Sequence, residues 1–122
     1  MKSWRQAVID AASLTKEWPA LDGPLEVTMT FWLPRPKSHY RTGRNAHLLR
    51  DSAPKYPHGK PDVSKLCRAT EDALTDAGIW ADDAQVVRYA ELAKEYADRW
   101  SGLEPFTGRE TPGAVITVRQ LT

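Results

Sequence analysis

Residues 63–77 carry the pattern that most narrows what this chain can fold into. Apolar or small side chains recur there at steps of three and four residues, at Val63, Leu66, Cys67, Thr70, Ala73, Leu74 and Ala77. That spacing places them on one buried face of an α-helix. Pro61 and Asp62 favour a helix start, and Gly78 favours a helix end because glycine adopts the left-handed conformation without steric cost. We therefore predict a helix over residues 62–77.

Acidic residues lie at both ends of this predicted helix. Asp62 precedes it, and Asp82 and Asp83 follow Trp80 in the next turn. One interpretation is structural, since aspartate is common at helix N-caps and in solvated turns. The other is a site for Mg²⁺ or Mn²⁺, because these hard cations prefer oxygen ligands and are often held by few carboxylates. The spacing alone does not decide between the two.

The ordered motifs around this helix resemble the signature of a known family. They read Pro-Asp-x-x-Lys-Leu at 61–66, Asp-Ala-Leu-Thr-x-Ala-Gly at 72–78 and x-Trp-x-Asp-Asp-Ala-Gln-Val-Val at 79–87. This order is similar to that of the RusA family of Holliday-junction resolvases, found in phages and prophages. The resemblance implies a Mg²⁺-dependent, homodimeric endodeoxyribonuclease that cuts branched DNA in recombination and repair, with Mn²⁺ as a second possible ion and no organic cofactor.

The resemblance also implies roles for individual residues. The metal-site carboxylates of the family correspond to Asp62 and Asp83, with Asp82 as a weaker ligand, and a family lysine corresponds to Arg68. Lys65 and Arg68 lie about one and two turns along the helix from Asp62, and either is a candidate for binding the scissile phosphate. We expect Asp62 and Asp83 to lie close enough to share one ion.

One position departs from the family pattern. Ser64 stands where the family usually has a second carboxylate, two residues after the first. A serine hydroxyl is a neutral and weaker ligand, so the site has one negative charge fewer. Three functions stay open: a junction-cutting nuclease, a branched-DNA-binding protein with weakened catalysis, and an α/β domain that binds a small molecule or a protein and has a coincidental acidic turn.

Residues 35–60 form a long segment in which nearly every charge is positive and apolar residues are few. A loop of this length is either solvated and poorly ordered or functional. In the functional interpretation its cations bind DNA phosphates and its tyrosines stack on exposed bases. The predicted DNA contacts are Arg35, Lys37, Tyr40, Arg41, Arg44, Lys65 and Arg68. The histidines of the segment lack the regular spacing of a zinc site.

The remaining patterns complete a small α/β domain. Residues 2–18 have the periodicity of an amphipathic helix, residues 25–33 alternate as a half-buried strand, and residues 113–121 read as a last strand. The periodicity of residues 85–97 suits a helix or a strand, and the family resemblance favours a strand. We predict one RusA-like domain over residues 1–122, with helices packed on a mixed sheet and the basic loop inserted before the central helix.

Composition sets further limits on this chain. The formal net charge is only +1 over 122 residues, which says little about partners. No apolar run is long enough to cross a membrane and no secretory signal is recognisable, so we expect a cytoplasmic protein without membrane partners. The single Cys67 lies on the apolar helix face, which predicts a buried thiol and excludes an intrachain disulfide. Glycines and prolines over residues 98–112 predict a loop.

Overall fold

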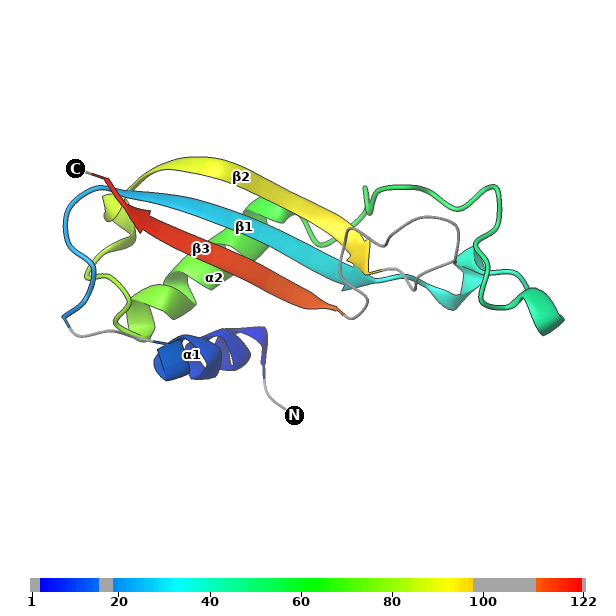
Figure 1. Ribbon diagram of the computed structural model, residues 1–122, viewed down its shortest axis with the longest axis horizontal. Coiled ribbons are helices and arrows are strands. Elements are labelled where there is room, and N and C mark those ends of the chain that lie inside the picture. The colour runs from blue at the N-terminus through cyan, green and yellow to red at the C-terminus, as the bar shows by residue number, and fades with distance from the viewer. Residues whose placement is uncertain (1–2, 16–18, 98–111, 122) are drawn as a thin grey trace. The chain divides into compact units, whose positions relative to one another are not determined.

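The structure is a computed structural model that describes residues 3–15, 19–97 and 112–121. Its helices and strands follow the order shown in Figure 1. They are α1 (Trp4–Thr15), β1 (Leu25–Pro34), α2 (Val63–Asp76), β2 (Val86–Ala97) and β3 (Gly113–Gln120), with short 3-10 helices η1 (Lys37–His39), η2 (Gly43–Asn45) and η3 (Asp83–Gln85). No helix in the described ranges is long and apolar enough to span a membrane.

The sheet is three-stranded and mixed, as predicted. Its strand order is β2-β1-β3, and the arrows in Figure 1 show β2 parallel to β1 and β3 antiparallel to β1. β1 and β3 confirm the strands predicted over residues 25–33 and 113–121, and β2 shows that residues 85–97 form a strand. The loop predicted over residues 98–112 lies, except for its last residue, outside the described residues.

Internal contacts divide the chain into two compact units. Unit 1 comprises Met1–Met29, Pro61–Leu92 and Ile116–Thr122, and unit 2 comprises Thr30–Lys60 and Ala93–Val115. Unit 1 therefore holds α1, α2, η3 and part of each strand, and unit 2 holds the remainder of the strands with the segment between β1 and α2. The single-domain organisation over residues 1–122 stays a prediction.

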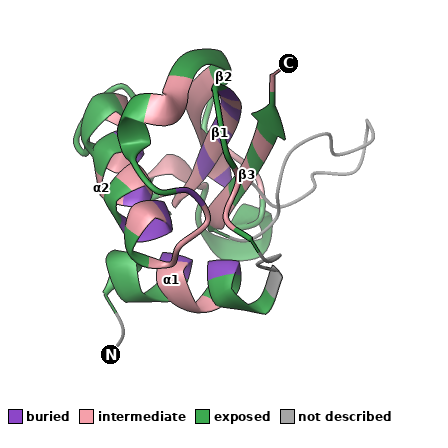
Figure 2. Cartoon of the chain, turned by 90° about the vertical axis from the view of Figure 1, so that its left-hand side faces the viewer, coloured by how far each residue is buried: buried purple, intermediate pink, exposed green. Residues whose placement is uncertain are grey.

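Unit 1 has its core on one face of its part of the sheet. α1 and α2 pack against each other on that face, and no described element covers the opposite face (Figures 1 and 2). β1 alternates as its sequence predicts, so that Leu25, Val27 and Met29 are fully buried. The buried face of α2 consists of Cys67, Thr70, Ala73 and Leu74. These four residues belong to the helical stripe expected from the sequence, so the stripe decides which side of α2 stays exposed.

One glycine ends α2, and two contacts hold α1 against it. Gly78 has φ of +75°, the left-handed conformation that the sequence predicts for the end of this helix. The indole Nε1 of Trp4 donates to Thr70 Oγ1 at 3.3 Å, and Arg5 forms an ion pair with Asp76. The position of α2 in unit 1 is thereby set at both its middle and its end.

Unit 2 contains residues 35–60, called here the basic segment. This segment has regular internal structure, because Tyr40 and Leu49 form an antiparallel bridge and the Arg41 N–H donates to the Leu48 carbonyl at 2.8 Å. The result is a short hairpin that carries η2 at its tip (Figure 1). These backbone hydrogen bonds argue against a poorly ordered loop.

Candidate functional site

Asp62 occupies the N-cap position of α2 but does not cap the helix. Its backbone is extended, with φ of −68° and ψ of 143°, and its side chain makes no capping hydrogen bond. The carboxylate is 56% exposed and forms only a loose ion pair, in which Lys65 Nζ lies 4.0 Å from Oδ2. The structural role expected of an N-cap is therefore not used, and the Asp62 oxygens are available to a ligand.

The predicted phosphate-binding cations lie on the exposed side of α2. Ser64, Lys65 and Arg68 are all exposed, while Cys67 between them is buried. Lys65 lies beside Asp62, whereas the Arg68 side chain forms no hydrogen bond or ion pair with any residue in the described ranges. The guanidinium of Arg68 is thus the better placed of the two to bind an incoming anion.

Asp82 and Asp83 are adjacent but differ in their bonding. Asp82 accepts a hydrogen bond from the Ala84 N–H at 2.9 Å and caps η3, so one of its oxygens is engaged. Asp83 lies within η3 and is exposed, and its side chain has no partner among the described residues. The buried Trp80 precedes both and donates through Nε1 to Thr75 Oγ1 at 2.7 Å, which ties this acidic turn to the end of α2.

Gln85 fixes the acidic turn, defined as Asp82 and Asp83, to another part of unit 1. Its Oε1 accepts from the backbone N–H groups of Ala81 and Asp82 at 2.9 and 3.0 Å. Its Nε2 donates to the carbonyls of Leu21 and Gly23, both at 3.1 Å. The sequence did contain a signal for the local bonds, because an aspartate followed three residues later by glutamine is the spacing of a capping box. The bonds to Leu21 and Gly23 depend on the tertiary fold.

The structure does not bring Asp62 and Asp83 together within one chain. α2 has 14 residues between them, and at 1.5 Å per residue it is about 21 Å long. Figure 1 shows the first turn of α2 and the start of β2, where η3 lies, at opposite ends of unit 1. No group of three His, Cys, Asp or Glu side chains able to hold a metal occurs among the described residues. One chain therefore does not meet the expectation that both carboxylates share an ion.

A polar cluster that the sequence did not indicate joins α2 to β2. Tyr89 Oη donates to Glu71 Oε2 at 2.7 Å, and Cys67 Sγ donates to Tyr89 Oη at 3.4 Å. Burial raises the pKa of the Cys67 thiol and the pKa of the Tyr89 hydroxyl above their ordinary values, so both groups stay protonated at neutral pH. The predicted buried thiol is confirmed. Only the four-residue spacing of Cys67 and Glu71 could have hinted at the cluster, because Tyr89 joins it through the tertiary fold.

Arg35, a predicted DNA contact, forms a network inside unit 2. Its Nη1 donates to the Pro54 carbonyl at 2.7 Å and lies 3.2 Å from Nδ1 of His39. The guanidinium carbon is 4.0 Å from the centre of the Tyr96 ring, and His39 packs edge-on against the same ring with 5.4 Å between centroids. Arg35 therefore holds the basic segment against β2, a structural role that depends on a residue far away in the sequence.

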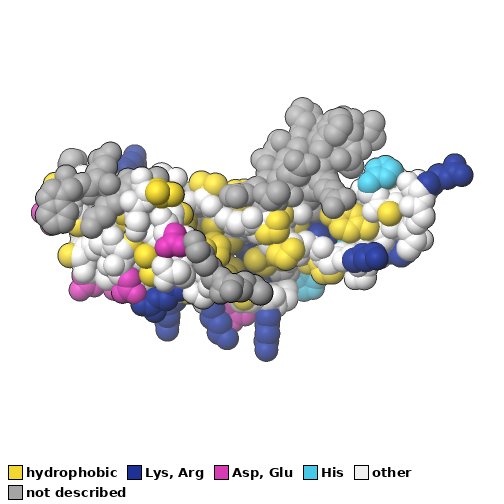
Figure 3. All heavy atoms as spheres, turned by 90° about the horizontal axis from the view of Figure 1, so that it is seen from below, with side chains coloured by type: hydrophobic (Ala, Val, Ile, Leu, Met, Phe, Trp, Pro, Cys, Tyr) yellow, Lys and Arg dark blue, Asp and Glu magenta, His cyan; other side chains and the backbone are white. Residues whose placement is uncertain are grey.

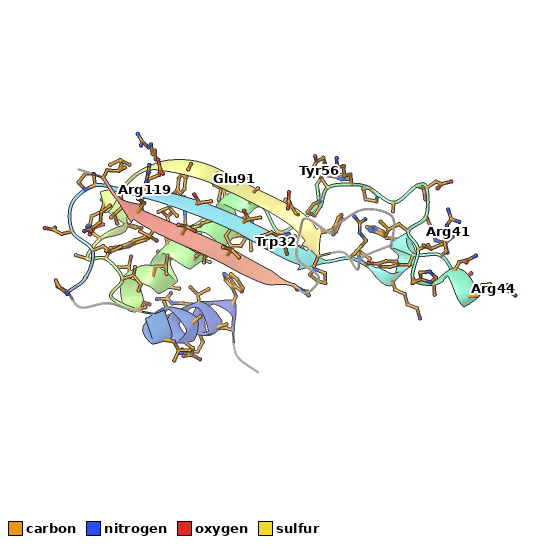
Figure 4. All side chains as sticks on the ribbon, in the orientation of Figure 1. Trp32, Arg41, Arg44, Tyr56, Glu91 and Arg119 are labelled. Carbon is orange, nitrogen blue, oxygen red and sulfur yellow. The ribbon has the colours of Figure 1, made fainter. Side chains whose placement is uncertain are left out.

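The remaining predicted cations of the basic segment are exposed. Arg41 pairs with Asp51 at 3.3 Å. The side chains of Lys37 and Arg44 form no hydrogen bond or ion pair within the part of the chain that the structure describes. Figure 4 shows Arg44 at the tip of the hairpin beyond Arg41, and Figure 3 shows Lys and Arg side chains on the surface of this hairpin. Tyr40 is half-buried in the hairpin, so its ring is only partly open to stacking.

Comparison with known proteins adds to this geometry. The family model of the endodeoxyribonuclease RusA matches residues 1–119 of the chain. The matched range includes Asp62, the acidic turn and the basic segment. A comparison with curated proteins gave no match.

Proposed function

Because this chain belongs to the RusA family of endodeoxyribonucleases, we propose that it cuts Holliday junctions and other branched DNA with Mg²⁺ as cofactor. Members of the family act on branched DNA junctions and generally depend on a divalent metal. The family match over residues 1–119 is the observation that carries the proposal. An α/β domain with a coincidental acidic turn is the interpretation that this match disfavours most.

We propose Asp62 and Asp83 as the metal ligands, with Asp82 weaker because it caps η3. The chemistry of the donors suits the ion, since Mg²⁺ prefers carboxylate oxygens and usually keeps several waters. One chain does not assemble them, because α2 separates the two carboxylates. The fit improves if two copies of the chain form each site, one supplying Asp62 and the other Asp83. Such a homodimer has two equivalent sites, as two symmetric cuts across a four-way junction require.

Divalent ions in nuclease sites activate a water and stabilise the charge that develops on the phosphoryl and leaving oxygens. In this proposal the side chains of the protein bind and orient the DNA. Arg68 would bind the scissile phosphate, because its planar guanidinium matches two phosphate oxygens. It holds its proton at neutral pH, so we assign it to phosphate binding and not to acid catalysis. Lys65 would balance the charge of Asp62, beside which it lies.

The basic segment would supply affinity that does not depend on DNA sequence. Lys37, Arg41 and Arg44 are exposed, and each can neutralise a backbone phosphate and release a counterion. Tyr40 is a weaker candidate for base stacking because it is half-buried. We leave Arg35 out of the proposed contact set, since it already holds the segment in place through the Pro54 carbonyl and the Tyr96 ring.

A second candidate function is branched-DNA binding with weakened cleavage. The observation that favours it is Ser64, which is exposed in the first turn of α2 where the family resemblance predicts a carboxylate. A neutral hydroxyl attracts a divalent cation less strongly than a carboxylate does. Mg²⁺-dependent cleavage of a synthetic four-way junction distinguishes the two candidates, because binding without cleavage supports the second.

The sharpest test of the proposed site is complementation between two inactive variants. We expect Asp62→Asn and Asp83→Asn each to cut junctions at least about 100-fold more slowly than the natural protein when prepared alone. If each site takes one carboxylate from each copy, a co-expressed mixture contains heterodimers with one intact site and one doubly altered site. The mixture should then regain nicking of one strand, although neither variant alone cuts.

Asp72→Asn is the matched control for this experiment. Asp72 is an exposed carboxylate on α2 and lies outside the proposed site, so its loss should leave cleavage unchanged. A mixture that stays inactive while the natural protein cuts would contradict a site shared between copies. Full activity of either single variant would remove that carboxylate from the proposed ligands.

A further inference from the structure

Three strands of unit 1 each contribute one charged side chain to a single cluster. Glu26 lies on the central strand β1, Arg88 on β2 and Arg119 on β3. Arg88 Nε is 2.6 Å from Glu26 Oε2, and Arg119 Nη2 is 2.9 Å from Glu26 Oε1. Each oxygen of one carboxylate therefore binds a different guanidinium, and the two guanidiniums are held close to each other.

The cluster has an excess positive charge. It contains two guanidiniums and one carboxylate, and the hydrogen bond from Arg88, supported by Arg119, lowers the pKa of Glu26 below its ordinary value. Glu26 is consequently ionised at neutral pH, and the cluster carries a net charge of +1. In contrast, the pairs of Arg5 with Asp76, Arg41 with Asp51 and Lys65 with Asp62 match one cation with one anion.

The charges are arranged so that the cations face the solvent. The Glu26 side chain is 14% exposed, whereas those of Arg88 and Arg119 are 58% and 63% exposed. A guanidinium has five N–H donors, and Glu26 is the sole partner of both arginines within the described residues, so most donors are left over. The nearly buried carboxylate of Glu26 thus holds the two guanidiniums in place, with their remaining N–H donors facing the solvent.

The position of the cluster gives a large ligand access to it. Glu26 alternates on β1 with the buried Leu25 and Val27, so its side chain lies on the other face of the sheet, where Arg88 and Arg119 bind it. Neither helix covers this face of the unit 1 sheet (Figures 1 and 2). Figure 4 labels Arg119 at the end of β3. A phosphate group has several oxygens and can accept from two neighbouring guanidiniums at once.

We propose that Arg88 and Arg119, held by Glu26, form a phosphate-binding site that takes a backbone phosphate of the DNA on the open sheet face. The site is separate from Arg68 on α2 and from the basic segment, and its assignment to DNA rests on the proposed function. It would add a further contact with the substrate, on the face of the unit 1 sheet opposite the helices.

The competing explanation is that the cluster only ties the three strands together. The two explanations predict different effects of Glu26→Gln on the affinity for DNA. If the arginines bind phosphate, Glu26→Gln removes the competing carboxylate and should increase affinity for DNA. If the cluster is only an interstrand tie, Glu26→Gln leaves two cations in repulsion, lowers the melting temperature and gives no gain in binding.

The first measurement is the salt dependence of binding to an unbranched DNA duplex without divalent metal, so that it does not depend on cleavage. The double variant Arg88→Gln/Arg119→Gln should lose about 0.9 from the slope of log affinity against log salt for one phosphate contact. The ratio of natural to variant affinity should then change about threefold between roughly 50 and 200 mM salt. Glu26→Gln should bind more tightly than the natural protein. Arg5→Gln, which breaks a one-to-one pair elsewhere in unit 1, is the control and should keep the natural slope.

The second measurement uses inorganic phosphate as the probe. Phosphate at constant ionic strength should raise the melting temperature of Glu26→Gln more than that of the natural protein, because a ligand of the folded state stabilises it. The arginine double variant should show no such increase. A melting-temperature increase in a protein that binds no duplex would overturn the DNA assignment and indicate a free phosphate ligand.

The outcomes separate this inference from the proposed function. If the natural protein binds duplex without cutting junctions and the arginine double variant loses salt slope, the nuclease is contradicted and the phosphate site is supported. An unchanged slope in the double variant, together with no gain in Glu26→Gln, would overturn the phosphate site even if the protein cuts junctions.

Discussion

The two ends of α2 carry the same kind of side chain in different states. At the first end Asp62 makes no capping bond and is 56% exposed. At the other end Asp82 and Gln85 form a complete capping box, and Gln85 also reaches the carbonyls of Leu21 and Gly23. The difference shows that the place of an acid at a helix end does not decide its role. Asp62 is left available to a ligand, whereas Asp82 is used to fix the position of its neighbour Asp83.

The substitution with the largest expected effect on this difference between the two ends is Gln85→Ala. One half-buried side chain makes four hydrogen bonds there, so we expect its loss to lower the free energy of unfolding by about 2–3 kcal/mol. Ser64→Ala, at the first end of α2, should change it by less than about 0.5 kcal/mol because the side chain is exposed. Urea unfolding measures both. Equal effects would mean that the two ends are held alike.

The first end of α2 also follows the basic segment in the chain, and charge removal there tests its role. Lys37→Ala/Arg44→Ala removes two exposed cations that have no ion pair among the described residues. Junction affinity should fall about tenfold near 50 mM salt, and the salt slope should decrease by about 1.8 if both bind phosphates. Arg41, which is paired with Asp51, offers a matched single variant with a smaller expected loss. An unchanged slope would assign these cations to solvent.

A smaller effect separates the two aspartates directly. Asp82→Ala removes the acceptor of the Ala84 N–H, and loss of such a cap typically costs about 1 kcal/mol. Asp62→Ala removes no capping bond and should leave the free energy of unfolding nearly unchanged. Thermal or urea unfolding of the two variants side by side gives the comparison. A larger loss for Asp62→Ala would show that this residue stabilises α2 in a way that its side-chain contacts do not reveal.

Local patterns predicted the elements well, because they depend on residues close in sequence. The helix expected over residues 62–77 is observed as Val63–Asp76, and the strand expected over residues 25–33 is observed as Leu25–Pro34. The period of α2 follows from one buried face, and the alternation of β1 follows from its central place between two strands. β2 was ambiguous because it lies at an edge, where most of its residues keep some exposure and neither period dominates.

The sequence predicted which residues belong to the candidate site, but it did not predict how they are arranged in space. Family motifs pointed to Asp62 and Asp83, yet the length of α2 keeps them apart in one chain. Arg35 looked like a DNA contact in the sequence, and only the fold shows its guanidinium over the ring of Tyr96. Glu26 likewise meets Arg88 and Arg119 through strand register, which no local pattern reports. Side-chain pairing across a sheet is decided by tertiary structure, so such clusters stay hidden from the sequence.

The smallest expected effect comes from adding a second carboxylate beside Asp62, at the first end of α2. Ser64→Asp adds a carboxylate in the exposed first turn, near Asp62, so that the metal-free protein gains like-charge repulsion there. Attraction of the new charge to the N-terminus of the helix opposes this repulsion by a similar amount, so the melting temperature without metal should change little.

Ser64→Asp should differ from the natural protein in its response to Mg²⁺. If a missing ligand limits metal binding, junction cleavage should increase a few-fold at low Mg²⁺, and the difference should narrow as Mg²⁺ saturates the site. Mg²⁺ should also raise the melting temperature of Ser64→Asp more than that of the natural protein, which gives a readout besides activity. Ser64→Asn is the matched control, since it has nearly the same size without the charge. If Ser64→Asp and Ser64→Asn behave alike in both titrations, position 64 does not take part in metal binding, and the carboxylates of this chain must hold the ion without it.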